Sequence, residues 1–93
     1  MLFIVIEQFR DAKAVYRRLR ERGRMLPKGL KYIESWTEGN YSRCFQLMEC
    51  DDARLFSRWV IQWQDLVDFE IVPVVPSEKA AKAIATRKNK NQS

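Results

Sequence analysis

Histidine is absent from this chain of 93 residues, and cysteine, glycine and proline are scarce, with two, three and three residues. Without histidine, a zinc site of the usual kind lacks one of its main ligands. Cys44 and Cys50 lie on one predicted strand, about 20 Å apart at a rise of about 3.3 Å per residue, so they cannot form a disulfide with each other. We therefore expect reduced thiols, no metal and no cofactor, in a cytoplasmic protein.

Long apolar segments and nucleotide-binding motifs are missing as well. The run Met1–Ile6 ends at Glu7 and has no basic residues before it, so it predicts neither a signal peptide nor a membrane span. No glycine-rich phosphate loop and no nucleophile motif is present. Together with the missing histidine, these absences argue against most acyl-transfer, phosphoryl-transfer and metal-assisted chemistry.

The net charge of +5 is concentrated at the C-terminal end of the chain. Five basic residues and one acidic residue follow Pro76. We divide the chain into a domain at residues 1–76 and a basic tail at residues 77–93, which is predicted to be helical over Ser77–Thr86 and disordered from Arg87 on. The tail predicts weak, salt-sensitive association with polyanions. No recognition helix or aromatic RNA platform accompanies it, so no specific nucleic-acid partner is predicted.

Apolar periodicity divides the body into alternating strands and helices. A β-branched run predicts a buried strand at Leu2–Phe9, and Asp11 can cap the amphipathic helix that follows. A second helix with an unusually aromatic stripe begins after Asp51–Asp52. Phe69–Val75 is predicted as the last strand. Because proline has no N–H to donate, Pro73 either places this strand at a sheet edge or marks where its pairing stops.

The segment from Leu30 to Asp52 predicts a β-hairpin. Its two alternating runs flank Gly39–Asn40, a dipeptide typical of two-residue turns, and this turn would pair Trp36 with Arg43. A period of two then sorts the hairpin residues onto two faces. The first face carries Leu30, Tyr32, Glu34, Trp36, Arg43, Phe45, Leu47 and Glu49, and the second carries Lys31, Ile33, Ser35, Thr37, Ser42, Cys44, Gln46, Met48 and Cys50.

The order strand, helix, strand, strand, helix, strand predicts an α+β, ferredoxin-like βαββαβ fold, in which both helices cover one face of a four-stranded antiparallel sheet. The other face would carry large apolar groups, which a monomer rarely exposes. We expect the bulky helices to pack on the smaller side chains of Ser35, Cys44 and Gln46. The face with Trp36 and Phe45 would then meet a second subunit, which predicts a homodimer.

Three stretches carry a family resemblance: Arg18 to Trp36, Ser42 to Asp52, and Asp65 to Ser77. Together they resemble a bacterial family of small domains of unknown function, which is similar to the dimeric α+β barrel superfamily of antibiotic-biosynthesis monooxygenases and muconolactone isomerases. The resemblance implies the same fold and the same dimer. Haem-degrading members of that superfamily use an axial histidine, which this chain lacks. Activity inferred from the fold alone is analogy.

Two groups of side chains can furnish a small-molecule pocket, which needs apolar walls and a few polar groups. Tyr32, Trp36, Arg43 and Glu49 form one group, and Ser35, Cys44, Gln46 and Trp63 form the other. In the structural alternative, Trp36 and Arg43 form a cation–π pair worth about 0.5–1 kcal/mol. Burial would raise the pKa of a carboxyl such as Glu34 or Glu49 and make it a candidate proton shuttle.

Three functions remain open from the sequence. The protein is a binding module for a small apolar or aromatic molecule, a cofactor-independent monooxygenase- or isomerase-like enzyme, or a purely structural dimer. Consumption of a stabilising ligand would distinguish the enzyme from the binding module. A dry interior would favour the structural dimer.

Overall fold

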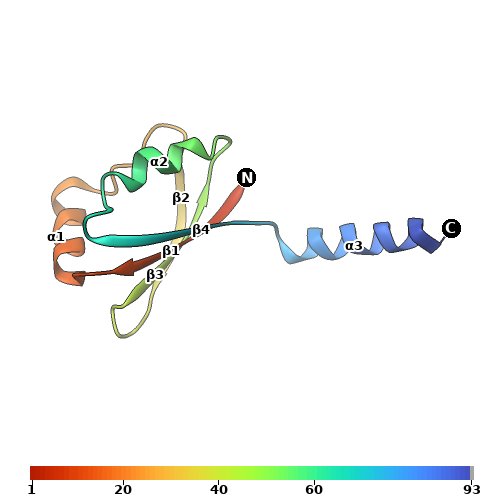
Figure 1. The fold of residues 1–93 in the computed structure, drawn as a ribbon, viewed down its shortest axis with the longest axis horizontal. Helices are drawn as coiled ribbons and strands as arrows, with labels where there is room; N and C mark the ends of the chain where they lie inside the picture. The colour runs from red at the N-terminus through yellow and green to blue at the C-terminus, as the bar shows by residue number, and fades with distance from the viewer. Residues whose placement is uncertain (93) are drawn as a thin grey trace.

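The computed structural model describes the backbone of residues 1–92 and the side chains of residues 1–86. Figure 1 shows a sheet covered on one side by two helices, with a third helix that extends away from this body. The elements are β1 (Leu2–Phe9), α1 (Ala12–Arg22), β2 (Lys31–Thr37), β3 (Arg43–Glu49), α2 (Arg54–Val60), β4 (Val67–Val74) and α3 (Ser77–Gln92).

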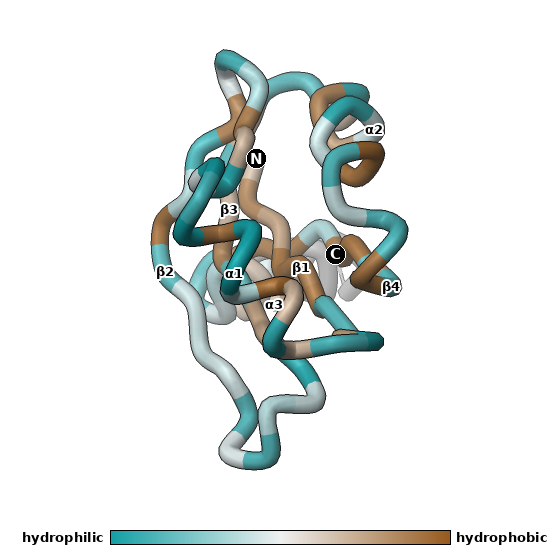
Figure 2. Tube along the Cα trace, turned by 90° about the vertical axis from the view of Figure 1, so that its left-hand side faces the viewer, coloured by the Kyte–Doolittle hydropathy of each residue, from teal (hydrophilic) through white to brown (hydrophobic). Residues whose placement is uncertain are grey.

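The sheet has the strand order β2-β3-β1-β4, and all neighbouring strands are antiparallel. This order confirms the ferredoxin-like α+β arrangement that the sequence predicts. The strand β4 lies at an edge, as the position of Pro73 indicated. Hydrophobic residues follow the central strands, and hydrophilic residues dominate the loops and α1 (Figure 2).

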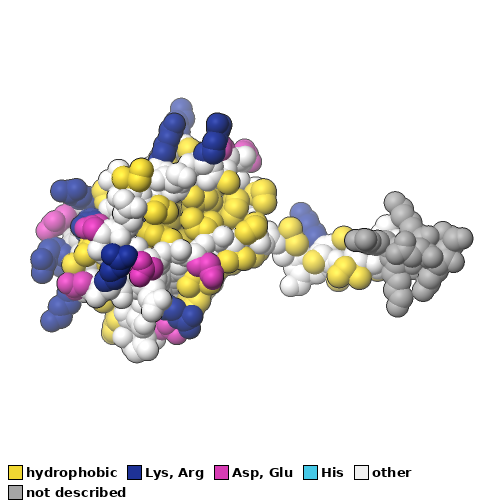
Figure 3. Space-filling model, in the orientation of Figure 1, with side chains coloured by type: hydrophobic (Ala, Val, Ile, Leu, Met, Phe, Trp, Pro, Cys, Tyr) yellow, Lys and Arg dark blue, Asp and Glu magenta, His cyan; other side chains and the backbone are white. Residues whose placement is uncertain are grey.

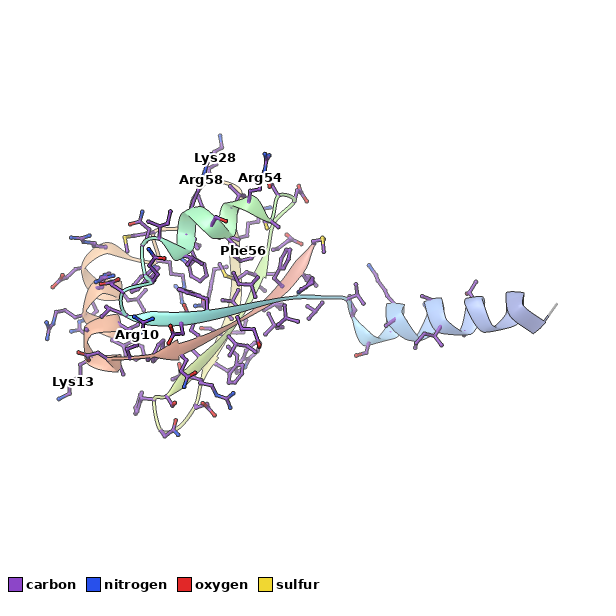
Figure 4. All side chains as sticks on the ribbon, in the orientation of Figure 1. Arg10, Lys13, Lys28, Arg54, Phe56 and Arg58 are labelled. Atoms are coloured by element: carbon purple, nitrogen blue, oxygen red, sulfur yellow. The ribbon has the colours of Figure 1, made fainter. Side chains whose placement is uncertain are left out.

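The core lies between the sheet and the two helices. Val5 and Met48 are completely buried on the central strands, and the ring of Phe3 meets Phe56 edge to face at 4.8 Å. Figure 4 shows that Phe56 points from α2 toward the sheet, whereas Arg54 and Arg58 of the same helix point away from it. The aromatic stripe of α2 therefore supplies its buried side, as its period predicts.

Helix α1 begins and ends at the residues that the sequence suggests. The side chain of Asp11 accepts a hydrogen bond from the backbone N–H of Ala14 at 3.1 Å, which caps the first turn. Gly23 ends the helix with φ of 67°, and its N–H donates to the carbonyl of Leu19. This left-handed conformation is one that glycine adopts without steric cost.

The two-residue turn predicted at Gly39–Asn40 is wrong. The N–H of Glu38 donates to the carbonyl of Arg43 at 2.8 Å, so four residues form the loop, and Trp36 pairs with Phe45 instead of Arg43. The side chain of Asn40 accepts a hydrogen bond from the N–H of Ser42, a local interaction that stabilises a longer turn. The register moves by two residues, which preserves the predicted faces from Glu34 onward.

A register shift between Tyr32 and Glu34 changes the start of the hairpin. Tyr32 pairs with the buried Met48 and therefore lies on the helix-covered face, opposite to the prediction. Ile33, at the shift, is 46% exposed. An irregularity of this kind leaves no signal in the alternation of apolar residues.

The face of the sheet turned away from α1 and α2 is called the open face here. Directly paired residues lie on the same face, so the register assigns its members. Its apolar residues are Leu2, Ile4, Ile6, Trp36, Phe45, Leu47, Val72 and Val74. Trp36 is 55% exposed and Val72 is 36% exposed, and Figure 1 shows α1 and α2 on the other side of the sheet.

Helix α3 leaves the end of β4 and projects from the body (Figure 1). It continues to Gln92, whereas the sequence predicted a helix only to Thr86 and disorder from Arg87. Lysine, arginine and glutamine are good helix formers, so the end of the helix need not coincide with the last alanine. Ser93 lies outside the described residues. Over residues 1–92, no helix is long and apolar enough to cross a membrane.

Candidate ligand-binding site

A pocket of about 90 Å³ lies between the sheet, α1 and the segment that follows α2. Its apolar walls are Phe9, Val15, Leu19, Trp59 and Trp63. Its polar groups belong to Glu7, Tyr16, Arg24, Ser35, Thr37, Cys44 and Gln46. An apolar cavity of about 150 Å³ holds one benzene molecule, so this smaller pocket takes at most one small ring or a short chain, and not a polycyclic compound.

Glu7 is the ionisable group on the floor of the pocket. It lies on the central strand β1, between Cys44 on β3 and Phe69 on β4, and it is only 6% exposed. The side-chain amide of Gln46 donates a hydrogen bond to its carboxyl at 2.6 Å. Burial raises the pKa of Glu7, while the hydrogen bonds from Gln46 and Cys44 and the charge of Arg24 act in the opposite direction.

Gln46 leaves a polar atom without a partner beside this carboxyl. Its amide nitrogen is used by Glu7, and its Oε1 is buried with no hydrogen-bond donor among the described residues. Buried polar atoms are almost always paired, and an unpaired one costs about 1–3 kcal/mol. A ligand that donates a hydrogen bond at this point would remove that cost.

Cys44 lies beside Glu7 and is also buried. Burial, reinforced by the neighbouring Glu7 carboxyl, raises the pKa of the Cys44 thiol to about 11. The thiolate is the nucleophilic form of cysteine, so Cys44 is not a nucleophile at neutral pH. It acts as a small polar wall of the pocket.

Two tryptophans and an arginine form another side of the pocket. The indole N–H groups of Trp59 and Trp63 both donate to the backbone carbonyl of Arg24, at 2.9 and 3.0 Å. The guanidinium of Arg24 lies over the ring of Tyr32, 3.6 Å from its centroid. The Tyr32 hydroxyl in turn lies 2.7 Å from the Ser35 hydroxyl. These contacts fix the loop that joins α1 to β2 against the segment after α2.

The predicted site residues separate into two sets. Cys44, Gln46 and Trp63 line the pocket, and Tyr32 joins them indirectly because Arg24 stacks on it. The remaining three, Trp36, Arg43 and Glu49, lie on the opposite face of the sheet.

The predicted cation–π pair between Trp36 and Arg43 is replaced by other contacts. Arg43 forms an ion pair with Glu38 at 2.7 Å, and its guanidinium lies over Phe45 at 5.2 Å. The carboxyls proposed as proton shuttles, Glu34 and Glu49, are not buried. The buried carboxyl is that of Glu7.

Sequence reasoning missed Glu7 and Arg24. A signal for Glu7 existed, because Phe3, Val5 and Glu7 alternate along a strand whose inward positions should all be apolar. Nothing in the sequence marks Arg24, which is one of several arginines around the end of α1 and reaches the pocket only through the conformation of the loop that follows.

The described part of the chain contains no cluster of three histidine, cysteine, aspartate or glutamate residues able to hold a metal ion. The pocket instead combines apolar walls, one buried carboxyl with a raised pKa, one unpaired amide oxygen and one guanidinium. Such an arrangement can bind a small polar–apolar molecule, orient it by hydrogen bonds, and accept or return a proton.

Comparison with known proteins gives a family but no activity. Residues 1–88 match the family model described as Domain of unknown function (DUF3303). No curated protein and no solved structure matches this chain significantly. Because the match spans almost the whole sequence, the chain belongs to the DUF3303 family.

Proposed function

We propose that this member of the DUF3303 family binds a small, largely apolar molecule, such as a single aromatic ring with polar substituents, in the pocket between sheet and helices. The observation that carries the proposal is the buried Oε1 of Gln46, which has no donor among the described residues and lies next to Glu7. A hydroxyl or amino group of a ligand supplies the missing donor, and the apolar walls bury the rest of the molecule.

A thermal-stability series tests ligand binding at this pocket. The probes are phenol, benzyl alcohol and 3-hydroxybenzyl alcohol, added to the full chain and to two variants. Val15→Phe fills the pocket from α1, and Ile61→Phe adds the same ring at an exposed position outside it. We expect at least one probe to raise the Tm of the wild type and of Ile61→Phe. At 100 times its Kd, the bound probe should raise the free energy of unfolding by about 2.7 kcal/mol.

In the Val15→Phe variant the added ring fills the pocket, so no probe should raise its Tm. A folded Val15→Phe protein with the same ligand-induced shift would place binding outside the pocket. No shift with any of the three probes would favour the purely structural dimer over a binding module.

Catalysis without a cofactor is a second candidate, and Glu7 is the observation that favours it. A buried carboxyl with a raised pKa can take a proton from one atom of a bound molecule and return it to another. This step needs no oxidant or metal, so it fits an isomerase-like reaction better than oxygen chemistry. The test is whether a probe that stabilises the protein is also converted, followed by NMR of the probe, with Glu7→Gln as the inactive control.

A second copy of this chain is our proposed partner for the open face. The face presents a continuous apolar surface from all four strands, larger than single exposed residues of a monomer would give. Acidic and basic residues lie among or beside these apolar groups, with Glu34, Glu49 and Glu70 of one sign and Lys31 and Arg43 of the other. When two identical sheets meet face to face, charges of both signs on each face can pair across the contact.

The dimer is tested by light scattering of a double variant. Trp36→Glu with Phe45→Glu places two carboxylates on the open face and should yield a monomer or an aggregate. The control, Tyr41→Glu with Ile61→Glu, changes two exposed residues outside that face and should leave the mass of a dimer. A stable dimer in the first variant would assign the interface to another surface.

A further inference from the structure

Arg18 and Arg24 are the two half-buried arginines within residues 1–86, and the others there are exposed. Arg18 forms an ion pair with Asp65. Arg24 is half-buried at the pocket, and among the side chains of residues 1–86 it has no ion pair and no hydrogen-bond acceptor. A guanidinium has five N–H donors, so this one keeps an unused set of donors at the pocket.

The position of Arg24 is fixed from two sides. Its backbone carbonyl accepts the indole N–H groups of Trp59 and Trp63, and its guanidinium stacks on Tyr32 at 3.6 Å. Stacking uses the flat face of the guanidinium and leaves its edge, which carries the N–H groups, available. A carboxylate has the spacing that accepts two of these donors at once.

The polar groups of the pocket differ in how far they are buried. Glu7 and Gln46 are each 6% exposed and form the floor, whereas Arg24 is only half-buried and lies closer to solvent. Glu7 and Arg24 form no ion pair, although the charge of Arg24 lowers the pKa of the Glu7 carboxyl. Apolar side chains of α1 and the Trp63 ring line the space that these groups share.

We infer that the ligand is a small aromatic carboxylate with a hydroxyl or amino substituent on its ring. The inference rests on the proposed function and names its ligand class. The carboxylate pairs with the fork of Arg24, the ring lies against Trp63 and the aliphatic wall, and the substituent donates a hydrogen bond to Oε1 of Gln46. A molecule with only one of these polar groups leaves either the guanidinium or the amide oxygen without a partner.

Two probes that differ only in charge test this inference by isothermal titration of the full chain. The first is 3-hydroxybenzoate, and the second is 3-hydroxybenzyl alcohol, which keeps the ring and the hydroxyl and loses the carboxylate. We expect the acid to bind the wild type at least tenfold more tightly than the alcohol. Equal affinities, or tighter binding of the alcohol, would overturn the inference.

Variants locate the effect. Arg24→Gln removes the charge and keeps the backbone carbonyl that binds both indoles, so it should weaken binding of the acid at least tenfold and abolish the preference for the acid over the alcohol. Arg24→Lys keeps the charge without the planar fork, so its affinity for the acid should lie between those of the wild type and Arg24→Gln. Arg17→Gln is the matched control, because Arg17 is exposed on α1 in a surface groove with Lys13 and Arg20.

The outcomes separate this inference from the proposed function. Binding of the alcohol that is lost in Val15→Phe, together with no preference for the acid, would keep the pocket and overturn the carboxylate. Loss of acid binding in Arg17→Gln instead of Arg24→Gln would assign the anion to the surface groove and overturn the inference. Failure of both probes to bind the wild type would overturn the inference, and the same failure with phenol and benzyl alcohol would contradict the proposed function as well.

Discussion

At the scale of single residues, Glu7 affects both the stability of the fold and the chemistry of the candidate pocket. An ionisable residue at an inward strand position is costly when charged, because water is excluded from it. The hydrogen bond from Gln46 reduces this cost without supplying an opposite charge in direct contact. A ligand-free pocket therefore retains a carboxyl with a raised pKa and an amide oxygen without a donor.

The first prediction concerns the pH dependence that Glu7 imposes. Its pKa in the folded state lies above the unfolded value, so the folded protein binds more protons above pH 4.5, and stability falls as the pH rises through the raised pKa. Glu7→Gln removes this loss and can also donate to Gln46 Oε1. We expect the variant to exceed the wild type by roughly 1–3 kcal/mol at neutral pH, and by less at pH 4, in urea unfolding.

Glu21→Gln is the matched control for this experiment. Glu21 is exposed on α1, outside the pocket and the open face, so its replacement should change the stability little at either pH. A Glu7→Gln variant whose stability tracks that of the wild type from pH 4 to pH 8 would mean that Glu7 is ionised and well solvated in the folded protein.

At the scale of secondary-structure elements, an ion pair connects α1 to the segment before β4. Arg18 donates two hydrogen bonds to Asp65, at 2.8 and 2.7 Å, and one to the carbonyl of Gln62 at 2.9 Å. The guanidinium also lies 5.5 Å from the Trp63 ring centroid. This contact holds the helix that forms one pocket wall against the segment that carries Trp63.

The second prediction follows from the pKa of Asp65. The hydrogen bonds from Arg18 lower this pKa to about 2, below the ordinary value of 3.8. The stabilisation is complete above pH 3.8 and is lost as the pH falls toward 2. Asp65→Asn should therefore lower the Tm at pH 6 and have progressively less effect below pH 4. Asp51→Asn, at an exposed carboxyl with no ion pair among the described residues, should show no such convergence.

The sequence predicted which segments form strands and helices more accurately than it predicted the register between β2 and β3. Period and capping residues located β1, α1 and the aromatic side of α2, because burial of one face imposes a repeat that is visible in the chain. The loop after Glu38 and the irregularity beside Ile33 depend on local hydrogen bonds and positive φ at Tyr41, which do not alter the apolar pattern. The lining of the candidate pocket follows the same rule: the positions of Cys44 and Gln46 follow from strand parity, whereas that of Arg24 depends on a loop.

The third prediction addresses the relation of α3 to the body. No side chain of α3 within residues 77–86 is buried, and the helix projects into solvent (Figure 3). A chain that ends at Pro76 should therefore keep the Tm of the full chain and the ligand response of the pocket, as measured by differential scanning calorimetry. The full-length variant Ile84→Glu should behave in the same way.

A fall in Tm with both changes would contradict this view. It would mean that α3 packs on the body of a second copy, where Ile84 and the basic residues of the helix meet the open face. The predicted division of the chain at Pro76 would then be replaced by a single cooperative unit that includes α3.

At the scale of the whole molecule, the two faces of the sheet have different roles in our account. The helix-covered face carries the pocket, and the open face is the contact that we propose between two copies. The three tryptophans lie on both faces of the sheet: Trp59 and Trp63 line the pocket, and Trp36 lies on the open face. One experiment can therefore observe ligand binding and dimerisation separately in the same protein.

The measurement that tests the central claim most directly is an NMR titration of the three indole N–H signals of ¹⁵N-labelled full-length protein with 3-hydroxybenzoate and 3-hydroxybenzyl alcohol. Both pocket indoles donate to Arg24, so a ligand there should shift the signals of Trp59 and Trp63 and leave that of Trp36 in place. Saturable shifts confined to those two signals are the predicted result. A shift of Trp36 alone, or no shift at all, would contradict the claim that the pocket between sheet and helices is the binding site.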